Sequence, residues 1–270
     1  MIFPGTRTIG LTLAFMVFLA GCTPMADTPA GSESDFWNPP ALAEDAGPIP
    51  DGRAIIGKMV EFMASHDELA AEALLTYEAV QESGQKLHFD LLHRIAVRKS
   101  EKKLYWTTLR DDGTTDQGWI TNGEFTLIKR PANIYAQIDG PVAIPEMVTM
   151  LTEEYGIDVP FEDVISGDAS DLWLGDEITE ITYVGEAFIG GRWTDQVAIR
   201  KPGMDIEIWV VKGDAPYPAK IAAVFTEIEG LPSYVLKFQK YSTVLPTSES
   251  INLEIPEDAE RVDLSPVVAY

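Results

Sequence analysis

The stretch EITYVGEAFIGGRWTDQVAIRKPGMDIEIWVV, residues 180–211, alternates apolar and polar side chains in three short runs. The runs are separated by Gly190-Gly191 and Pro202-Gly203, and both pairs consist of residue types that favour tight turns. A period of two between such turns predicts strands that bury one face each. Because the turns are short, we expect an antiparallel meander, in which neighbours in the sequence are also neighbours in the sheet.

The same pattern continues on both sides of this stretch. Upstream, Asn122-Gly123 is the strongest short hairpin signal in the chain, and a charged connection from Arg98 to Lys103 separates two other apolar runs. The further strands that we expect are 87–97, 104–106, 119–120, 125–128, 219–227, 233–241 and 251–255.

Two helices are expected to interrupt the strands. The first has apolar residues at helical spacing, namely Ile55, Ile56, Met59, Phe62, Met63 and Leu69. The second begins near Pro145 and ends at Gly156, and a softer helical or turn stretch follows it up to about Leu174. A sheet of this size must curl, and its inner face needs a cover. The sequence therefore predicts an α+β fold: an open, strongly curved antiparallel half-barrel of about ten strands, with two main helices covering the concave face.

The N-terminus has the features of an export signal. Arg7 precedes an apolar run from Ile9 to Ala20, which is shorter than the roughly 20 residues that span a bilayer. Leu19-Ala20-Gly21-Cys22 resembles the bacterial lipobox, and the resemblance implies cleavage before Cys22 and acylation of that cysteine with chains such as palmitate. The alternative is a soluble secretory signal that happens to contain a cysteine.

The domain organisation follows from these features. We expect a lipoprotein signal peptide at 1–21, the acylated cysteine with a disordered, proline-rich tether at 22–52, and a folded domain at 53–270. Phe36-Trp37 in the tether could dock on the domain or on the membrane. Thr23 follows the cysteine where an aspartate would favour retention in the inner membrane of some bacteria, so we expect a lipid-anchored protein of the bacterial outer membrane that faces the periplasm.

The composition excludes some functions. The formal net charge is −23, which repels nucleic acid. The three histidines are His66, His88 and His93, and the last two are five residues apart on one expected strand, so they point to opposite faces. We therefore expect no metal site, no cofactor and no catalytic residues. A nucleophile elbow and a phosphate loop are both missing from the sequence, so we expect no enzyme.

Four stretches carry a resemblance to a known family. They are EAVQESGQKLHFD (78–90), TNGEFTLIKRPANIYAQI (121–138), EEYGIDVPFEDVI (153–165) and MDIEIWVVKGDAPYPAKI (204–221). They resemble the predicted periplasmic proteins called domain of unknown function 2092, and the order of elements is similar to that of the LolA/LolB lipoprotein-carrier superfamily. The likeness covers about residues 53–262. It implies a LolA-like half-barrel whose apolar cavity accepts acyl chains.

The resemblance favours a lipid-binding function over a catalytic one. The candidate ligand-binding residues combine the helical lid with apolar strand positions: Met59, Met63, Phe89, Leu91, Trp106, Phe125, Met147, Leu151 and Phe225. Methionine fills irregular apolar space, although ordinary core packing would explain the same residues. The alternative is a ligand-free structural adaptor that docks another envelope protein through its charged faces. A hydrolase would need a cleft with converging polar groups.

Two segments of opposite charge bear on the adaptor alternative. Residues 86–110 contain seven Lys and Arg side chains, and residues 153–186 contain eleven Asp and Glu side chains and no Lys or Arg. They could be two solvated faces. They could also polarise the molecule, so that the basic hairpin faces lipid head groups or an acidic partner.

Overall fold

The structure is a computed structural model of the whole chain, and it describes residues 48–161, 173–245 and 254–267. The expected signal peptide, Cys22 and Phe36-Trp37 lie outside the described residues. The same holds for most of the expected strand 251–255 and of the stretch that follows the second helix. In the described residues, helices that combine the length and the apolar character needed to cross a membrane are not found.

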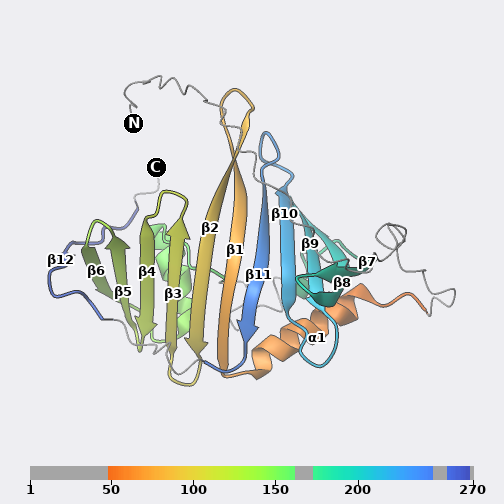
Figure 1. Cartoon of the computed structure of the whole chain (residues 1–270), viewed down its shortest axis with the longest axis horizontal. Coiled ribbons are helices and arrows are strands. Elements are labelled where there is room, and N and C mark those ends of the chain that lie inside the picture. The colour runs from red at the N-terminus through yellow and green to blue at the C-terminus, as the bar shows by residue number, and fades with distance from the viewer. Residues whose placement is uncertain (1–47, 162–172, 246–253, 268–270) are drawn as a thin grey trace, which may run out of the picture. The chain divides into compact units, whose positions relative to one another are not determined.

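One sheet of twelve strands forms the body of the domain, in the order β12-β6-β5-β4-β3-β2-β1-β11-β10-β9-β8-β7 (Figure 1). The strands are β1 (Glu68–Val80), β2 (Lys86–Arg98), β3 (Lys103–Arg110), β4 (Thr115–Thr121), β5 (Glu124–Arg130), β6 (Ile134–Asp139), β7 (Glu180–Ile189), β8 (Arg192–Lys201), β9 (Met204–Val211), β10 (Pro218–Phe225), β11 (Ser233–Ser242) and β12 (Glu260–Arg261).

Two antiparallel meanders, β1 to β6 and β7 to β11, make up this sheet. They join where β1 pairs with β11, and we call this junction the seam. The chain then returns to the far edge, where β12 pairs with β6 in parallel. The predicted meanders are confirmed, and the predicted count of about ten strands is too low. The sequence reading missed β1 and β6, and it did not anticipate the parallel strand at the edge.

Helix α1 spans Gly52–Ser65 and begins at Asp51, whose carboxylate accepts a hydrogen bond from the backbone N–H of Arg53. Such a cap satisfies one of the free N–H groups of the first turn. The apolar face of the helix is buried, as the periodicity predicts. The assignment of Leu69 to this helix is wrong: the helix ends before Asp67, and Leu69 is the second residue of β1.

Helix α2 spans Ile144–Tyr155, as predicted, with Pro145 in its first turn. Gly156 ends it in the left-handed conformation, with a φ of 61°, and its N–H bonds to the last helical carbonyls. Glycine adopts this conformation without the steric cost that a Cβ atom brings. The residues that α2 buries are Ile144, Met147, Val148 and Leu151.

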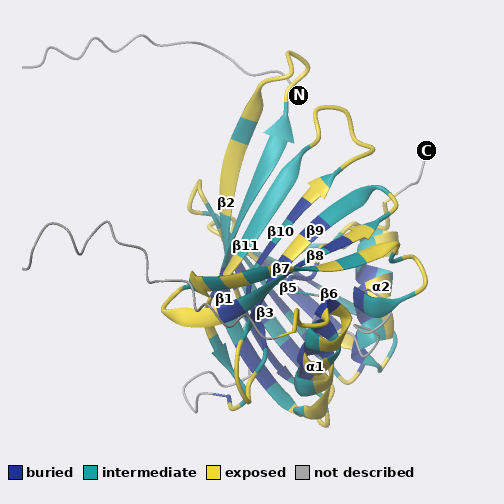
Figure 2. Cartoon of the chain, turned by 90° about the vertical axis from the view of Figure 1, so that its right-hand side faces the viewer, coloured by how far each residue is buried: buried dark blue, intermediate teal, exposed yellow. Residues whose placement is uncertain are grey.

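The core lies on the concave face in two parts. Residues of α1 pack on strands β7 to β11, in a set that we call the α1 cluster, whose buried members include Ile56, Met59, Met63, Val197 and Ile208. Residues of α2 pack on β2 to β5, in the α2 cluster, whose buried members include Trp106, Phe125, Met147 and Leu151. Figure 2 shows the buried residues concentrated where the sheet faces the two helices. The predicted half-barrel with two helices over its concave face is confirmed.

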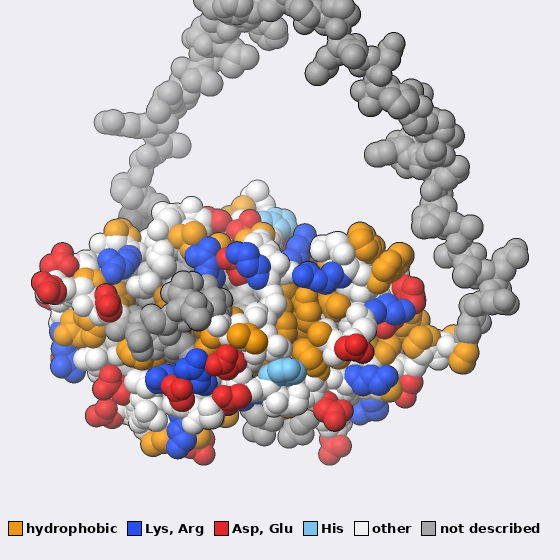
Figure 3. Space-filling model, turned by 60° about the horizontal axis from the view of Figure 1, so that its bottom comes forward, with side chains coloured by type: hydrophobic (Ala, Val, Ile, Leu, Met, Phe, Trp, Pro, Cys, Tyr) orange, Lys and Arg blue, Asp and Glu red, His pale blue; other side chains and the backbone are white. Residues whose placement is uncertain are grey.

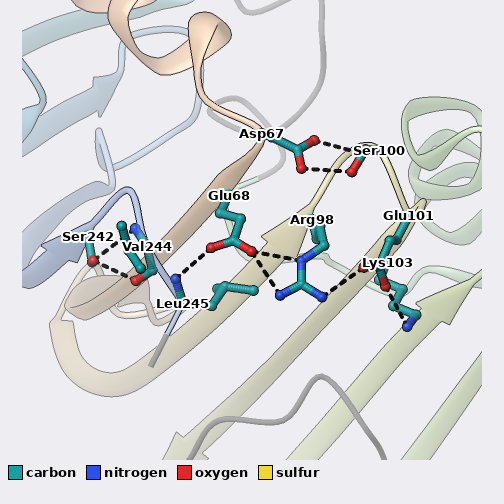
Figure 4. A network of polar contacts seen from close by, with 9 residues as sticks. All are labelled: Asp67, Glu68, Arg98, Ser100, Glu101, Lys103, Ser242, Val244 and Leu245. Carbon is teal, nitrogen blue, oxygen red and sulfur yellow. Dashed lines mark hydrogen bonds and ion pairs between the residues drawn. The ribbon is translucent and has the colours of Figure 1, made fainter. Parts of the chain in front are cut away.

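A polar network fixes one end of the seam (Figure 4). Glu68 accepts a hydrogen bond from the backbone N–H of Leu245 at 3.0 Å and forms an ion pair with Arg98 at 2.8 Å. These two contacts, the backbone bond first, lower the pKa of Glu68. Asp67 binds the hydroxyl and the N–H of Ser100, both at 2.7 Å. The network thus connects the start of β1, the end of β2 and the segment that leaves β11.

Candidate functional site

A cavity of about 500 Å³ lies on the concave face over the seam. Strands β1, β2, β9, β10 and β11 form its floor. Residues 158–161, which follow α2, and Trp173 complete its lining. The lining is Leu75, Tyr77, Leu91, His93, Asp158, Val159, Pro160, Phe161, Trp173, Met204, Ile221, Phe225, Tyr234 and Leu236.

Strand register explains why these side chains converge. Leu75 pairs with Leu91 across β1 and β2, and it also pairs with Leu236 across the seam. Residues directly opposite each other in antiparallel strands point to the same face. The apolar floor is therefore a row of cross-strand neighbours drawn from both meanders.

His93 is the buried titratable group in this lining, with 7% of its surface exposed. Its Nδ1 atom lies 3.0 Å from the Thr108 hydroxyl, and its ring meets that of Phe161 edge-on at 5.9 Å. Loss of solvent, followed by the positive charge of Arg110, lowers the pKa of His93 to about 4. Its imidazole is therefore neutral at pH 7.

Two of the nine residues predicted from the sequence line the cavity, namely Leu91 and Phe225. Phe89, 37% exposed, lies just beyond it and stacks on Tyr77 at 5.6 Å. The other six are buried outside the cavity. Met59 and Met63 belong to the α1 cluster, and the α2 cluster contains Trp106, Phe125, Met147 and Leu151.

The side chains of the α2 cluster pack directly against one another. The rings of Trp106 and Phe125 stack at 5.8 Å and 9°. Trp106 lies across Gly118 on the neighbouring strand, where an added Cβ would come within 2.1 Å of the indole. Glycine at this position makes room for the tryptophan. The space beside the aromatic pair is therefore filled by neighbouring residues of the chain.

The sequence analysis does not predict several residues of the cavity lining, because it does not predict the strand β1. Leu75 and Tyr77 lie on that strand, and Tyr234 and Leu236 face the cavity only because β11 pairs with it. The sequence analysis weighs His93 only as a metal ligand. Its spacing of two from Leu91 already places both side chains on the same face of β2, and this signal could have identified it.

A second depression, of about 410 Å³, lies around Arg200 on strands β7 to β10. Arg200 pairs there with Asp205 at 2.8 Å and with Glu180 at 3.5 Å. The charged groups of this depression are engaged with one another, and of the two acidic partners of Arg200, Glu180 is exposed and Asp205 is half-buried. It is therefore a weaker candidate than the seam cavity.

The basic segment 86–110 is largely paired with acidic side chains. The pairs are Lys86–Glu78, Arg94–Glu72, Arg98–Glu68, Arg98–Glu101, Lys103–Glu101 and Arg110–Asp116. In Figure 3, Lys and Arg side chains alternate with Asp and Glu over the face in view. These pairs favour the interpretation of the basic segment as a solvated face. In the described residues, groups of three or more His, Cys, Asp or Glu that could hold a metal are not found.

Comparison with solved structures gives distant similarity. An uncharacterised conserved protein from Thermus thermophilus is 13% identical, with a TM-score of 0.46, over 78% of this chain and 98% of that one. Lipoprotein LppX of Mycobacterium tuberculosis is 11% identical, with a TM-score of 0.47, over 72% and 96%. A LolA superfamily protein from Nitrosomonas europaea is 7% identical, with a TM-score of 0.31, over 74% and 96%. At these scores the similarity says nothing about the function of this chain.

Family membership has a firmer basis. A search of curated proteins gives no match. The model of the family DUF2092, described as predicted periplasmic protein, matches residues 52–265, which include every described helix and strand of the domain. The resemblance noted from the four sequence stretches is thereby confirmed, and the chain belongs to the DUF2092 family of predicted periplasmic proteins.

Proposed function

We propose that this chain is a periplasmic lipoprotein of the bacterial envelope whose domain binds an acyl chain, or a similar hydrophobic ligand, in the seam cavity. The observation that carries the proposal is the cavity itself. Its volume of about 500 Å³ lies within the ~300–1,000 Å³ range of small-molecule sites. Its lining is mostly apolar, as a site for a hydrocarbon chain requires.

The position of the cavity supports ligand binding over the adaptor alternative. The apolar faces of α1 and α2 are satisfied by their own clusters. A fully packed adaptor would continue that packing across the seam. Between the two helices lies the seam cavity instead, whose lining includes Ile221 of the α1 cluster and Val159 of the α2 cluster. This arrangement favours a ligand that completes the core.

The binding energy would come from apolar burial. Each Å² of apolar surface removed from water contributes about 25 cal/mol, and shape requirements on a flexible chain are weak. Binding of this kind favours a class of ligands over a single compound, and the protein would act as a carrier or sensor rather than as a catalyst.

The anchor is the second part of the proposal. Acylation of Cys22, with chains such as palmitate, would hold the protein on the outer membrane and leave the domain in the periplasm. One acyl chain binds a membrane only marginally, whereas several chains hold stably. The proline-rich residues after Cys22 would serve as the tether.

A pair of tryptophan substitutions tests the cavity. Leu91→Trp places a large ring in the cavity, whereas Leu92→Trp puts the same ring on the other face of β2, at a position that is also half-buried. We expect native mass spectrometry of protein purified from its own envelope to show bound lipid in the wild type and in Leu92→Trp. Leu91→Trp should lose most of it. The same spectra report the mass of the acyl groups on Cys22.

Two results would contradict the proposal. The first is wild-type protein that carries no lipid and takes up no fluorescent fatty acid. The second is equal lipid content in both variants, which would place the ligand outside the seam cavity. Circular dichroism checks that each variant is folded.

A further inference from the structure

We propose that His93 is the polar contact point of the seam cavity, and that it selects ligands whose apolar chain ends in an uncharged hydroxyl or ester group over those that end in a carboxylate. This inference rests on the proposed function and names the class of ligand. It concerns a side chain that packing alone would not require, since an apolar residue would complete the floor equally well.

The geometry leaves one ring nitrogen for a ligand. Nδ1 of His93 is engaged with the Thr108 hydroxyl at 3.0 Å. Among the residues that the structure describes, Nε2 has no hydrogen-bond partner, and the side chain lines the cavity at 7% exposure. Because His93 lines the cavity, a ligand that enters it can make a hydrogen bond to Nε2 and gains affinity from that bond.

The position of His93 places the polar group at the inner end of the cavity. The next residue of β2 on the same face, Ile95, belongs to the α2 cluster and is not part of the lining. In the other direction the face continues through Leu91 to Phe89, and the residues become more exposed. A ligand would therefore point its polar end towards His93 and its chain towards the β1–β2 hairpin.

The surrounding charges favour an uncharged group. His93 is neutral at pH 7 and offers no ion pair to a carboxylate. The nearby cation, Arg110, is held by Asp116 at 2.6 Å, and Asp116 also meets Lys129 at 3.3 Å. The other charged group in the lining is the carboxylate of Asp158, which would repel a second carboxylate.

The chemistry of imidazole suits hydroxyl and ester groups. The Thr108 hydroxyl can donate to Nδ1 or accept from it, so Nε2 can present either an N–H or a lone pair. A ligand hydroxyl can bond to both forms, and an ester carbonyl can accept from the N–H form. Neither group carries a charge that must be stripped of water on entry, whereas a carboxylate does.

A displacement experiment tests the inference on the folded domain. The neutral fluorophore N-phenyl-1-naphthylamine is bound first, and three competitors with the same hydrocarbon chain displace it at neutral pH: dodecanol, monolaurin and laurate. For the wild type we expect dodecanol and monolaurin to act at concentrations at least about tenfold lower than laurate. A factor of ten is about what one added neutral hydrogen bond contributes.

Three variants connect this preference to the imidazole. His93→Leu should still bind the fluorophore but lose the preference, and His93→Gln, which keeps a hydrogen-bonding group, should retain part of it. His88→Leu is the matched control, because His88 lies on the same strand with an exposed side chain that pairs with Glu78. This variant should behave as the wild type does.

The outcomes separate this inference from the proposed function. If laurate competes as well as dodecanol, or if His93→Leu keeps the preference, the role of His93 is refuted while lipid binding stands. If the fluorophore and all three competitors fail to bind the folded wild-type domain, both proposals are refuted.

Discussion

The two apolar regions of the concave face contain similar residues and differ in what fills them. Under α2, the rings of Trp106 and Phe125 stack on each other and are buried in one cluster with Met147 and Leu151. Over the seam, aliphatic and aromatic side chains of the same kinds surround a cavity. The difference lies in the cover. A helix with a full apolar face completes one region, whereas residues 158–161 and Trp173 line the other beside the strands. Apolar content alone therefore does not reveal which region is hollow.

The largest effect is expected from removing the filler of the packed region. Trp106→Ala deletes a fully buried ring and should lower the free energy of unfolding by about 3–5 kcal/mol. Trp193→Ala is the control, because Trp193 is 53% exposed, and it should change that free energy by about 0.5 kcal/mol or less. Urea unfolding measures both. A loss below about 1 kcal/mol in Trp106→Ala would mean that the α2 region is as loosely filled as the seam.

The next largest effect is expected in the pH dependence of stability, because His93 is a buried base in the cavity lining. Its pKa is lowered from 6.5 to about 4, so between these values the unfolded chain binds the proton more readily than the folded chain. The folded state therefore loses stability as pH falls from 6.5 towards 4, by roughly 3 kcal/mol. Above pH 6.5 this group makes no difference to the pH dependence.

The measurement is urea unfolding at several pH values in the wild type and in His93→Leu. Glu68, Glu72 and Glu78 have lowered pKa values, so their contribution is also lost in acid, but it is lost in both proteins. The difference between the two curves isolates His93. Parallel curves between pH 6.5 and 4 would show that the imidazole is accessible to protons in the folded state.

The smallest effect uses one substitution at two places. Gly118→Ala puts a Cβ within 2.1 Å of the Trp106 ring, and such overpacking should cost about 1–3 kcal/mol. Gly57→Ala, on α1, meets nothing closer than 4.0 Å and replaces a poor helix former, so it should add about 0.5–1 kcal/mol. Thermal unfolding measures both the expected loss of stability in Gly118→Ala and the expected gain in Gly57→Ala. A neutral Gly118→Ala would mean that the indole can move aside, as it could not in a tightly packed region.

The parts of the fold that were predictable carry local signals. Strands β7 to β11 are bounded by glycine and proline turns, and Gly156 ends α2 where the sequence indicates. The strand β1 lacks such a signal: ELAAEALLTYEAV is rich in alanine, leucine and glutamate, which favour helices. Its place between β2 and β11 overrides that preference, because pairing on both sides satisfies its backbone.

The cavity was harder to predict than the sheet for the same reason. Its floor depends on the pairing of β1 with β11, which no short stretch of sequence specifies. Leu91 and Phe225 were predicted because they alternate correctly on their own strands, whereas Leu75 and Leu236 require knowledge of the seam. Met147 and Trp106 are predicted as cavity lining because they are large and apolar. The sequence does not reveal that both pack into the same buried cluster.

The seam also has a consequence for how a newly made molecule forms the cavity. Ala70 pairs with Ser242 and Tyr77 with Tyr234. Strand β1 can therefore pair with β11 only after most of the chain has been synthesised. Pairing between such distant residues is slow, whereas the hairpins from β1 to β6 close locally. Before β11 joins the sheet, the floor of the cavity is incomplete. If the proposed lipid binds there, it therefore binds after β11 has joined the sheet and takes no part in early folding.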